Sequence, residues 1–172
     1  TIQVLSEKNK GTEFIISLPF RLVEHQQTLM PRCCETTCSY CEDRLKGLKA
    51  LLVDDNELNR EIAAELLSRR GLLVTTASNG AEAVSIIRDS DSRTFDLILM
   101  DIQMPVMDGH EASRNIRAME DPVKSTIPII ALSANAFEED RQRAYEAGIN
   151  EHVPKPIDMN VLEKAIISVV DK

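Results

Sequence analysis

The sequence has no tryptophan, and aromatic residues make up only 3% of its 172 residues. Leucine, isoleucine, valine and alanine must therefore build the core, for which a hydrophobic content of 43% is sufficient. No apolar run approaches the roughly 20 residues that a membrane-spanning helix needs, and the N-terminus lacks the layout of a signal peptide. These absences predict a cytoplasmic chain that is not itself in a membrane.

Cysteine is absent from residues 49–172, so no disulfide framework supports the main part of the chain. All four cysteines lie within nine residues, at Cys33, Cys34, Cys38 and Cys41. A zinc knuckle uses four such ligands, and a Cys-x-x-Cys pair also suits redox chemistry, but here the spacing is cramped and one pair is adjacent. We interpret the cluster as part of an inert linker, with metal binding and redox chemistry as the alternatives.

Basic patches and glycine-rich phosphate loops are also lacking. The net charge is -8, and residues 49–172 carry all of it, because positive and negative residues balance in the first 48. An acidic domain argues against direct nucleic-acid binding, which requires a basic face. We therefore expect no nucleic-acid partner.

Residues 1–22 have the pattern of two strands joined by a turn. "TIQVLS" alternates loosely, "EKNKGT" supplies the turn, and "EFIISLPF" is rich in β-formers. Two strands alone are marginal in water, which indicates that this piece is the tail of something larger. Residues 23–47 are polar and without clear periodicity, and we interpret them as a linker.

Residues 48–172 are regular: short apolar runs alternate with longer amphipathic stretches. The runs are LKALLV, LLVTT, DLILM, IPIIAL and EHVP, and the helix candidates are 57–70, 79–91, 108–120, 135–147 and 158–171. This alternation predicts an α/β fold, in which a doubly wound parallel sheet has helices on both faces. The strands read as apolar on both sides, as a buried parallel sheet requires.

Chemically useful side chains follow four of the five predicted strands. They are Asp54 and Asp55, Asp101, Ser133 and Lys155. Ligands bind at the carboxyl ends of the strands in such sheets. Three carboxylates gathered there raise one another's pKa values, and a divalent cation held by oxygen ligands, typically Mg²⁺, removes that cost.

Three anions, one cation and one ammonium group indicate a phosphoryl-transfer site. Asp101 stands alone after its strand and is the candidate nucleophile, while Asp54 and Asp55 both address the metal. Lys155 neutralises charge on the phosphoryl oxygens, and the Ser133 hydroxyl can donate a hydrogen bond to one of them. Each residue also has an ordinary interpretation, for example that the aspartate pair merely caps the first helix, but all of these would have to hold together.

Four motifs in order, "LLVDDNELNR", "DLILMDIQMPVMDG", "IIALSANA" and "HVPKP", closely resemble the receiver domain of two-component signalling. The resemblance covers residues 48–172 and implies a (βα)₅ fold with a five-stranded sheet of order 2-1-3-4-5. It implies that Asp101 accepts a phosphoryl group from a phosphohistidine. It also implies a switch role for the Ser133 hydroxyl, phosphate binding by Lys155 and a cis Lys155–Pro156 bond.

The metal ligands that the resemblance implies are Asp54, Asp55 and the backbone carbonyl of Gln103, which would hold Mg²⁺. One position departs from the family's pattern. Receivers usually carry tyrosine or phenylalanine three residues before the lysine, as a rotamer switch coupled to the hydroxyl, and here that residue is His152. A histidine can swing in the same way, but it also titrates near neutral pH.

The segment "GTEFIISLPF" resembles the closing strand of a histidine-kinase ATP-binding domain. Together with the receiver motifs, it implies a hybrid sensor histidine kinase, anchored in the inner membrane, of which this chain has the receiver and autophosphatase chemistry but no ATP site. The partners would be the kinase core, in the same chain or another, and a histidine phosphotransfer protein. The alternatives are a degenerate receiver that binds proteins without phosphorylation, and a stand-alone response regulator.

Overall fold

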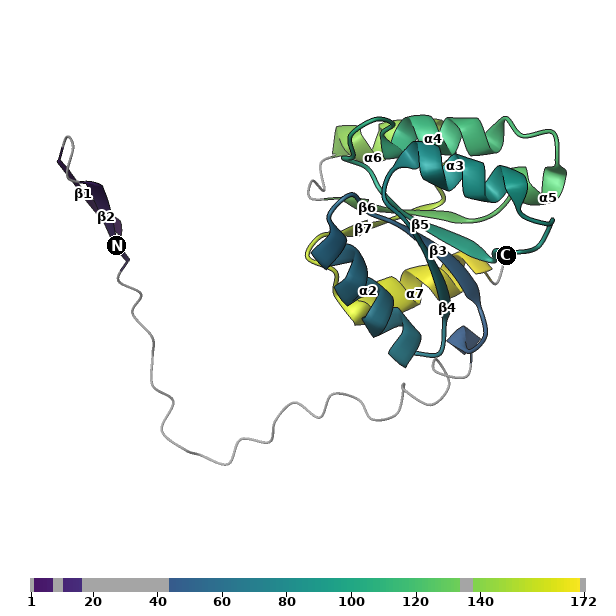
Figure 1. The fold of residues 1–172 in the computed structure, drawn as a ribbon, viewed down its shortest axis with the longest axis horizontal. Coiled ribbons are helices and arrows are strands. Elements are labelled where there is room, and N and C mark those ends of the chain that lie inside the picture. The colour runs from purple at the N-terminus through teal and green to yellow at the C-terminus, as the bar shows by residue number, and fades with distance from the viewer. Residues whose placement is uncertain (1, 8–10, 17–43, 134–137, 171–172) are drawn as a thin grey trace, which may run out of the picture. The chain divides into compact units, whose positions relative to one another are not determined.

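The computed structural model describes residues 2–7, 11–16, 44–133 and 138–170 (Figure 1). It divides into two compact units, Thr1–Glu35 and Thr36–Lys172. The cysteines Cys33, Cys34, Cys38 and Cys41 lie outside the described residues, so their predicted linker role stays a prediction. None of the described helices has the length and apolar character needed to cross a membrane.

The first unit contains an antiparallel hairpin, as its sequence predicted. Strand β1 (Ile2–Glu7) pairs with β2 (Gly11–Ile16). The neighbouring side chains of Val4 and Leu5 are 53% and 58% exposed. Because successive side chains of a strand point to opposite faces, both faces of this hairpin present apolar side chains.

The second unit contains a five-stranded parallel sheet. Its strands are β3 (Lys49–Val53), β4 (Leu73–Ala77), β5 (Leu97–Asp101), β6 (Ile129–Ser133) and β7 (Glu151–Pro154). Their spatial order is β4-β3-β5-β6-β7, and every neighbouring pair is parallel. Numbered within the sheet this is 2-1-3-4-5, which confirms the predicted fold.

Helices cover both faces of this sheet (Figure 1). On one side lie α2 (Glu57–Arg69) and α7 (Met159–Val170), and on the other α3 (Gly80–Asp89), α4 (Gly109–Arg117) and α6 (Glu138–Glu146). A short helix, α5 (Pro122–Ser125), follows α4. The sequence predicted a helix over 108–120, but α4 ends at Arg117, and Asp121 caps a separate short helix that begins with proline.

The burial of each strand follows from its place in the sheet. All residues of β5 and β6 are buried, as are the four apolar residues of β3, because helices cover these strands on both faces. The edge strand β4 differs: Leu73, Thr75 and Thr76 are exposed. Strand β7, at the other edge, is also only partly buried, and its Pro154 is exposed. The prediction that every strand is buried on both sides is therefore wrong for the two edge strands, each of which has only one neighbouring strand.

Helix α2 is less buried than its apolar pattern suggested. Leu67 is 1% exposed, but Leu58, Ile62 and Leu66 are 63%, 52% and 38% exposed. These three lie on successive turns of the helix, spaced four residues apart, and so form a continuous stripe. The sheet covers only one side of this apolar surface, and the stripe faces solvent.

Gly109 allows α4 to begin directly against the end of β5. Its amide donates to the Ile102 carbonyl at 3.0 Å, and a Cβ at this position would lie 2.3 Å from the backbone oxygen of Asp101. No rotamer change relieves that overlap, because the contact is with backbone. The glycine therefore fixes where the carboxyl end of β5 meets the helix.

We expect Gly109→Ala to lower the free energy of unfolding by about 3 kcal/mol, the upper end for an overpacked site. Urea unfolding followed by circular dichroism measures it. Arg114→Ala, an exposed position in the same helix, is the control and should change stability by less than about 0.5 kcal/mol. An equal effect of both substitutions would contradict the close approach at Gly109.

Candidate functional site

Two neighbouring strands end in carboxylates. Asp101 is the last residue of β5, and Asp54 directly follows β3. Because β3 and β5 pair in parallel, both side chains come to the same rim of the sheet. Ligand oxygens of Asp54, Asp55 and Asp101 all lie within 4.8 Å of one another. Asp54 and Asp101 are 3% and 5% exposed, whereas Asp55 is exposed.

Lys155 bridges the two buried carboxylates. It follows β7, at the far end of the chain, and its Nζ lies 2.7 Å from Asp54 Oδ2 and 2.6 Å from Asp101 Oδ2. The side chain of Lys155 is 21% exposed, so most of it is withdrawn from water. The Lys155–Pro156 peptide bond is cis, as the receiver resemblance implied.

The aspartate pair does not cap α2. That role belongs to Asn56, whose side chain accepts from the Asn59 amide. Asp54 instead accepts from the Asn56 amide through Oδ1, at 2.9 Å, while its Oδ2 is bound to Lys155. The capping interpretation of the pair is therefore wrong, and the carboxylates are held for another purpose.

Sequence reasoning missed Arg60, which lies in the first turns of α2. Its Nη1 donates to the backbone carbonyl of Asp54 at 2.7 Å. The signal was available: long side chains near a helix start point back toward its N-terminus. This bond ties the β3–α2 turn to the helix and thereby fixes the backbone that presents Asp54 and Asp55.

One ammonium group cannot neutralise three carboxylates. Burial raises the pKa of Asp101, and the charge of Asp54 acts in the same direction, although Lys155 and the Gln103 amide oppose them. Burial alone would lower the pKa of Lys155, but its bonds to Asp101 and Asp54 outweigh burial and raise it. The unbalanced negative charge at the rim favours a bound cation.

The raised pKa of Asp101 predicts a pH-dependent stability. Between the ordinary carboxyl pKa of 3.8 and the raised folded value, the folded state binds more protons than the unfolded state. Stability from this residue therefore falls as pH rises through that window. In metal-free buffer we expect Asp101→Asn to melt above the wild type at pH 7, and the two to converge at pH 3.

Thermal unfolding in EDTA across this pH range measures the difference between variant and wild type. Thr75→Ala, a change at an exposed side chain on β4 that does not titrate, is the control and should give a difference that does not change with pH. A constant difference for Asp101→Asn as well would contradict the raised pKa.

The carboxylates fit a magnesium ion. Mg²⁺ is held by oxygen ligands at about 2.0–2.1 Å, so that ligands on opposite sides of it are separated by about 4.2 Å. One ligand oxygen from each of the three side chains lies within 4.8 Å of the other two, and the exposed position of Asp55 leaves room for water. The Gln103 amide donates to Asp101 Oδ1 at 3.2 Å, which places Gln103 next to the cluster. Its carbonyl as a ligand stays a prediction.

Ser133 and His152 lie on the two strands beyond β5. Ser133 ends β6 and is 7% exposed. Its Oγ is 2.5 Å from Nε2 of His152, which is half-buried on β7. The backbone of Lys155 also bonds to this strand end, since its amide donates to the Ser133 carbonyl at 2.8 Å. All the predicted strand-end groups therefore meet at one rim.

Residues 50–167 match the family model of the response regulator receiver domain. The chain belongs to this family. Its function is that of a receiver in two-component phosphorelay signalling, and the converged carboxylates and Lys155 do not fit the degenerate alternative.

Two solved receivers are similar to this one. The receiver domain of the sensor histidine kinase PA1611 from Pseudomonas aeruginosa PAO1, solved with a magnesium ion coordinated in its active site cleft, is 36% identical with a TM-score of 0.66, and the match covers 73% of this chain and 99% of that one. The receiver domain of Saccharomyces cerevisiae Ssk1, solved with the histidine phosphotransfer protein Ypd1, is 30% identical with a TM-score of 0.66, covering 73% and 90%.

Curated relatives are much longer histidine kinases. The receiver is 39% identical to Probable histidine kinase 2 of Oryza sativa over 137 residues, which is 73% of this chain but 13% of the relative. It is 33% identical to the autoinducer 2 sensor kinase/phosphatase LuxQ of Vibrio parahaemolyticus over 166 residues, 96% of this chain and 18% of the relative. The chain thus spans under a fifth of these relatives.

Proposed function

We propose that Asp101 is the phosphoryl acceptor of this receiver. The observation that carries the proposal is a buried carboxylate at a strand end, bonded to Lys155 and within 4.8 Å of two further carboxylates. In the transfer, the bond between phosphorus and a donor histidine nitrogen breaks as one forms to an Asp101 oxygen, and the histidine leaves as a neutral imidazole after taking up a proton. The product is an acyl phosphate.

Other groups at the site assist phosphoryl transfer to Asp101. Lys155, already 2.6 Å from the carboxylate, pairs with the phosphoryl oxygens as they approach. Asp54, Asp55 and the Gln103 carbonyl hold Mg²⁺, which neutralises charge on the phosphoryl group when it is bound. The magnesium ion in the active site cleft of the similar receiver of PA1611 supports magnesium as the cation.

Acetyl phosphate labelling tests the function directly. With ³²P-labelled acetyl phosphate and Mg²⁺, we expect one label per chain that hydroxylamine removes, as it does from acyl phosphates, and no label in EDTA. Labelling that persists in EDTA at the same rate would contradict the metal-assisted site.

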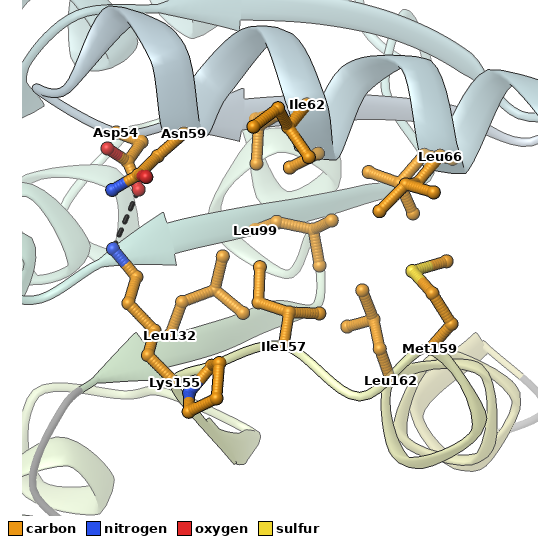
Figure 2. Close-up of a pocket in the computed structure, with 14 residues that line it drawn as sticks. Asp54, Asn59, Ile62, Leu66, Leu99, Leu132, Lys155, Ile157, Met159 and Leu162 are labelled. Carbon is orange, nitrogen blue, oxygen red and sulfur yellow. Dashed lines mark hydrogen bonds and ion pairs between the residues drawn. The ribbon is translucent and has the colours of Figure 1, made fainter.

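A groove leads from this site along α2. Its volume is about 510 Å³. Figure 2 shows Ile62 and Leu66 of α2 facing Ile157, Met159 and Leu162 across it, with Leu99 and Leu132 on the strands behind and Lys155 and Asp54 at one end. Arg70 pairs with Glu163 and joins α2 to α7. The groove is thus apolar and continuous with the charged site.

We infer that the histidine-bearing helix of a phosphodonor protein docks over this groove. Ile62 and Leu66 of the exposed stripe line the groove, and Leu58 adds apolar contact area one turn further along α2. Because Asp54 and Lys155 line the groove's end, a helix bound there places a side chain next to Asp101. The Ssk1 receiver solved with Ypd1 supports a histidine phosphotransfer protein as the partner.

Ile62→Glu is expected to slow transfer from a phosphorylated histidine phosphotransfer protein by about 30-fold, the cost of losing one strong interface contact. Labelling by acetyl phosphate should not change, because that reagent needs no docking surface. Leu73→Glu on β4, where leucine is also 58% exposed, is the matched control and should leave both rates unchanged. Equal slowing by the two variants would contradict docking on α2.

The hairpin supports a larger parent protein. Val4 and Leu5 expose apolar surface on both faces of a two-stranded sheet, which is marginal by itself. The match to LuxQ extends over 96% of this chain and so continues beyond the receiver. We infer that residues 1–22 complete the ATP-binding domain of a hybrid sensor histidine kinase and that residues 23–47 link it to the receiver.

A further inference from the structure

His152 shares a hydrogen bond with the hydroxyl group of Ser133. Residues on adjacent parallel strands face the same side when they are in register, and His152 is in register with Ala131, two residues before Ser133. Ser133 therefore projects on the same side of the sheet as the imidazole. The separation of 2.5 Å between Oγ and Nε2 leaves no room for another group between them.

Ser133 also ends the strand next to the one that Asp101 ends. In the ladder between β5 and β6, Asp101 is in register with Leu132, and Ser133 is the next residue. Neighbouring strands lie about 4.8 Å apart, so a phosphoryl group on Asp101 comes within reach of a hydroxyl on the adjacent strand end. The Ser133 hydroxyl therefore has two potential hydrogen-bond partners, the imidazole of His152 and the oxygens of a phosphoryl group on Asp101.

A hydroxyl has one proton to donate and two lone pairs to accept with. When Nε2 of a neutral imidazole accepts, the Ser133 proton points at His152. When the imidazole is charged, both ring nitrogens are donors, so Ser133 accepts from His152 and its own proton can be directed to another acceptor. Phosphoryl oxygens are acceptors only, and they need that proton.

We propose that His152 is a positioning residue that orients the Ser133 proton, so that the receiver holds a phosphoryl group more tightly when His152 is charged. The proposal rests on Asp101 as the phosphoryl acceptor. Imidazoles change charge between about pH 5 and 8, so the switch responds to pH in the physiological range. A phenylalanine or tyrosine at this position cannot be protonated and would leave no such response.

Several charged residues lie on β7 and on the elements that flank it. Those with described side chains are Glu151 on β7, Arg143, Tyr145 and Glu146 on α6, Glu163 and Lys164 on α7, Lys155 beyond the strand and Arg117, which reaches Asn150 from α4. Strand β6 contributes none. Helix α7 packs on the opposite face of β7, where Val153 points.

Among these groups, Glu151 is the one bound to the backbone of His152: its carboxylate accepts from the His152 amide at 3.1 Å. Glu163 is paired with Arg70, and Lys155 with the two buried aspartates. Arg143 and Glu146 are exposed and carry opposite charges.

Beryllofluoride, which attaches to a carboxylate as a phosphoryl mimic, tests the proposal without hydrolysis. Its apparent affinity is measured by NMR with Mg²⁺ at pH 6 and pH 8 for the wild type and for His152→Phe, which keeps an aromatic ring but no hydrogen bond. At each pH, the ratio of the wild-type affinity to the affinity of His152→Phe cancels the pH dependence of the reagent and of the metal site. We expect the wild-type affinity, relative to the variant, to be about fivefold higher at pH 6 than at pH 8, the equivalent of one hydrogen bond.

Two further variants make the result specific. The affinity of His152→Gln for beryllofluoride, relative to that of His152→Phe, should not change with pH, because glutamine is neutral at both pH values. His152→Gln also serves as the reference if His152→Phe folds poorly. In a Ser133→Ala background, replacing His152 should have no pH-dependent effect. The proposal would be overturned if the ratio of wild-type to His152→Phe affinity were the same at pH 6 and pH 8. It would also be overturned if a fivefold change of this ratio with pH persisted in the Ser133→Ala background.

Failure of the acceptor assignment gives a different outcome. If Asp101 is not the acceptor, Asp101→Asn binds beryllofluoride as tightly as the wild type at both pH values. If Asp101 is the acceptor but His152 does not orient the hydroxyl, Asp101→Asn loses binding while the ratio between wild type and His152→Phe stays constant with pH.

Discussion

Asp101→Asn should lose phosphoryl uptake from acetyl phosphate by at least about a thousandfold, because removing a nucleophile removes the covalent route altogether. Asparagine has nearly the same shape but no carboxylate to attack phosphorus. The other groups of the site remain: Lys155 keeps its bond to Asp54, and Asp55 is unaffected. Time courses of ³²P incorporation, with the wild type in parallel, measure the loss.

Asp89→Asn is the control for this prediction, since it makes the same chemical change at an exposed carboxylate on α3. It should take up label at the wild-type rate. Thermal unfolding of Asp101→Asn in the labelling buffer separates a loss of the nucleophile from a loss of folded protein. Label at the wild-type rate in Asp101→Asn would show that another residue is the acceptor.

Lys155→Ala has the second largest expected effect, a decrease of about 100- to 1,000-fold in the rate of phosphoryl uptake. The ammonium group contacts both buried carboxylates. Without it, charge on the incoming phosphoryl oxygens is not offset, and the pKa of Asp101 rises further because two opposing causes disappear. Some uptake should remain, since nucleophile and metal ligands are intact.

Two comparisons isolate the role of this lysine. Lys164→Ala, on the exposed side of α7, should leave the rate unchanged. Lys155→Arg keeps the positive charge but replaces a compact ammonium with a planar fork, so it should recover only part of the rate. A Lys155→Ala variant as slow as Asp101→Asn would mean that the lysine is needed to fold the site rather than to assist transfer.

The sheet and its chemical rim were predictable because both follow from short-range patterns. Buried parallel strands read as continuous apolar runs, and the residue where each run ends is visible in the sequence. That is how Asp54, Asp101, Ser133 and Lys155 were found, and the structure brings them to one rim. The roles of Asp101 and Lys155 in transfer still await the experiments above.

Other features depend on what the rest of the fold covers. The apolar pattern of α2 predicts a helix but does not show that Ile62 faces solvent, since that depends on where α7 lies. The threonines of β4 are exposed because the strand is at an edge, a property of the strand order. Likewise, the bond between Ser133 and His152 is set by the register of β6 with β7, not by their spacing in sequence.

The bond from Lys155 to Asp54 spans 101 residues. During synthesis, β3 and β5 emerge with their carboxylates long before β7 is made, so a nascent receiver carries the acidic cluster without its ammonium partner. The sheet can extend strand by strand, yet the site is electrostatically incomplete until the last βα unit docks. Competence for phosphorylation is therefore acquired late, when nearly the whole domain has left the ribosome.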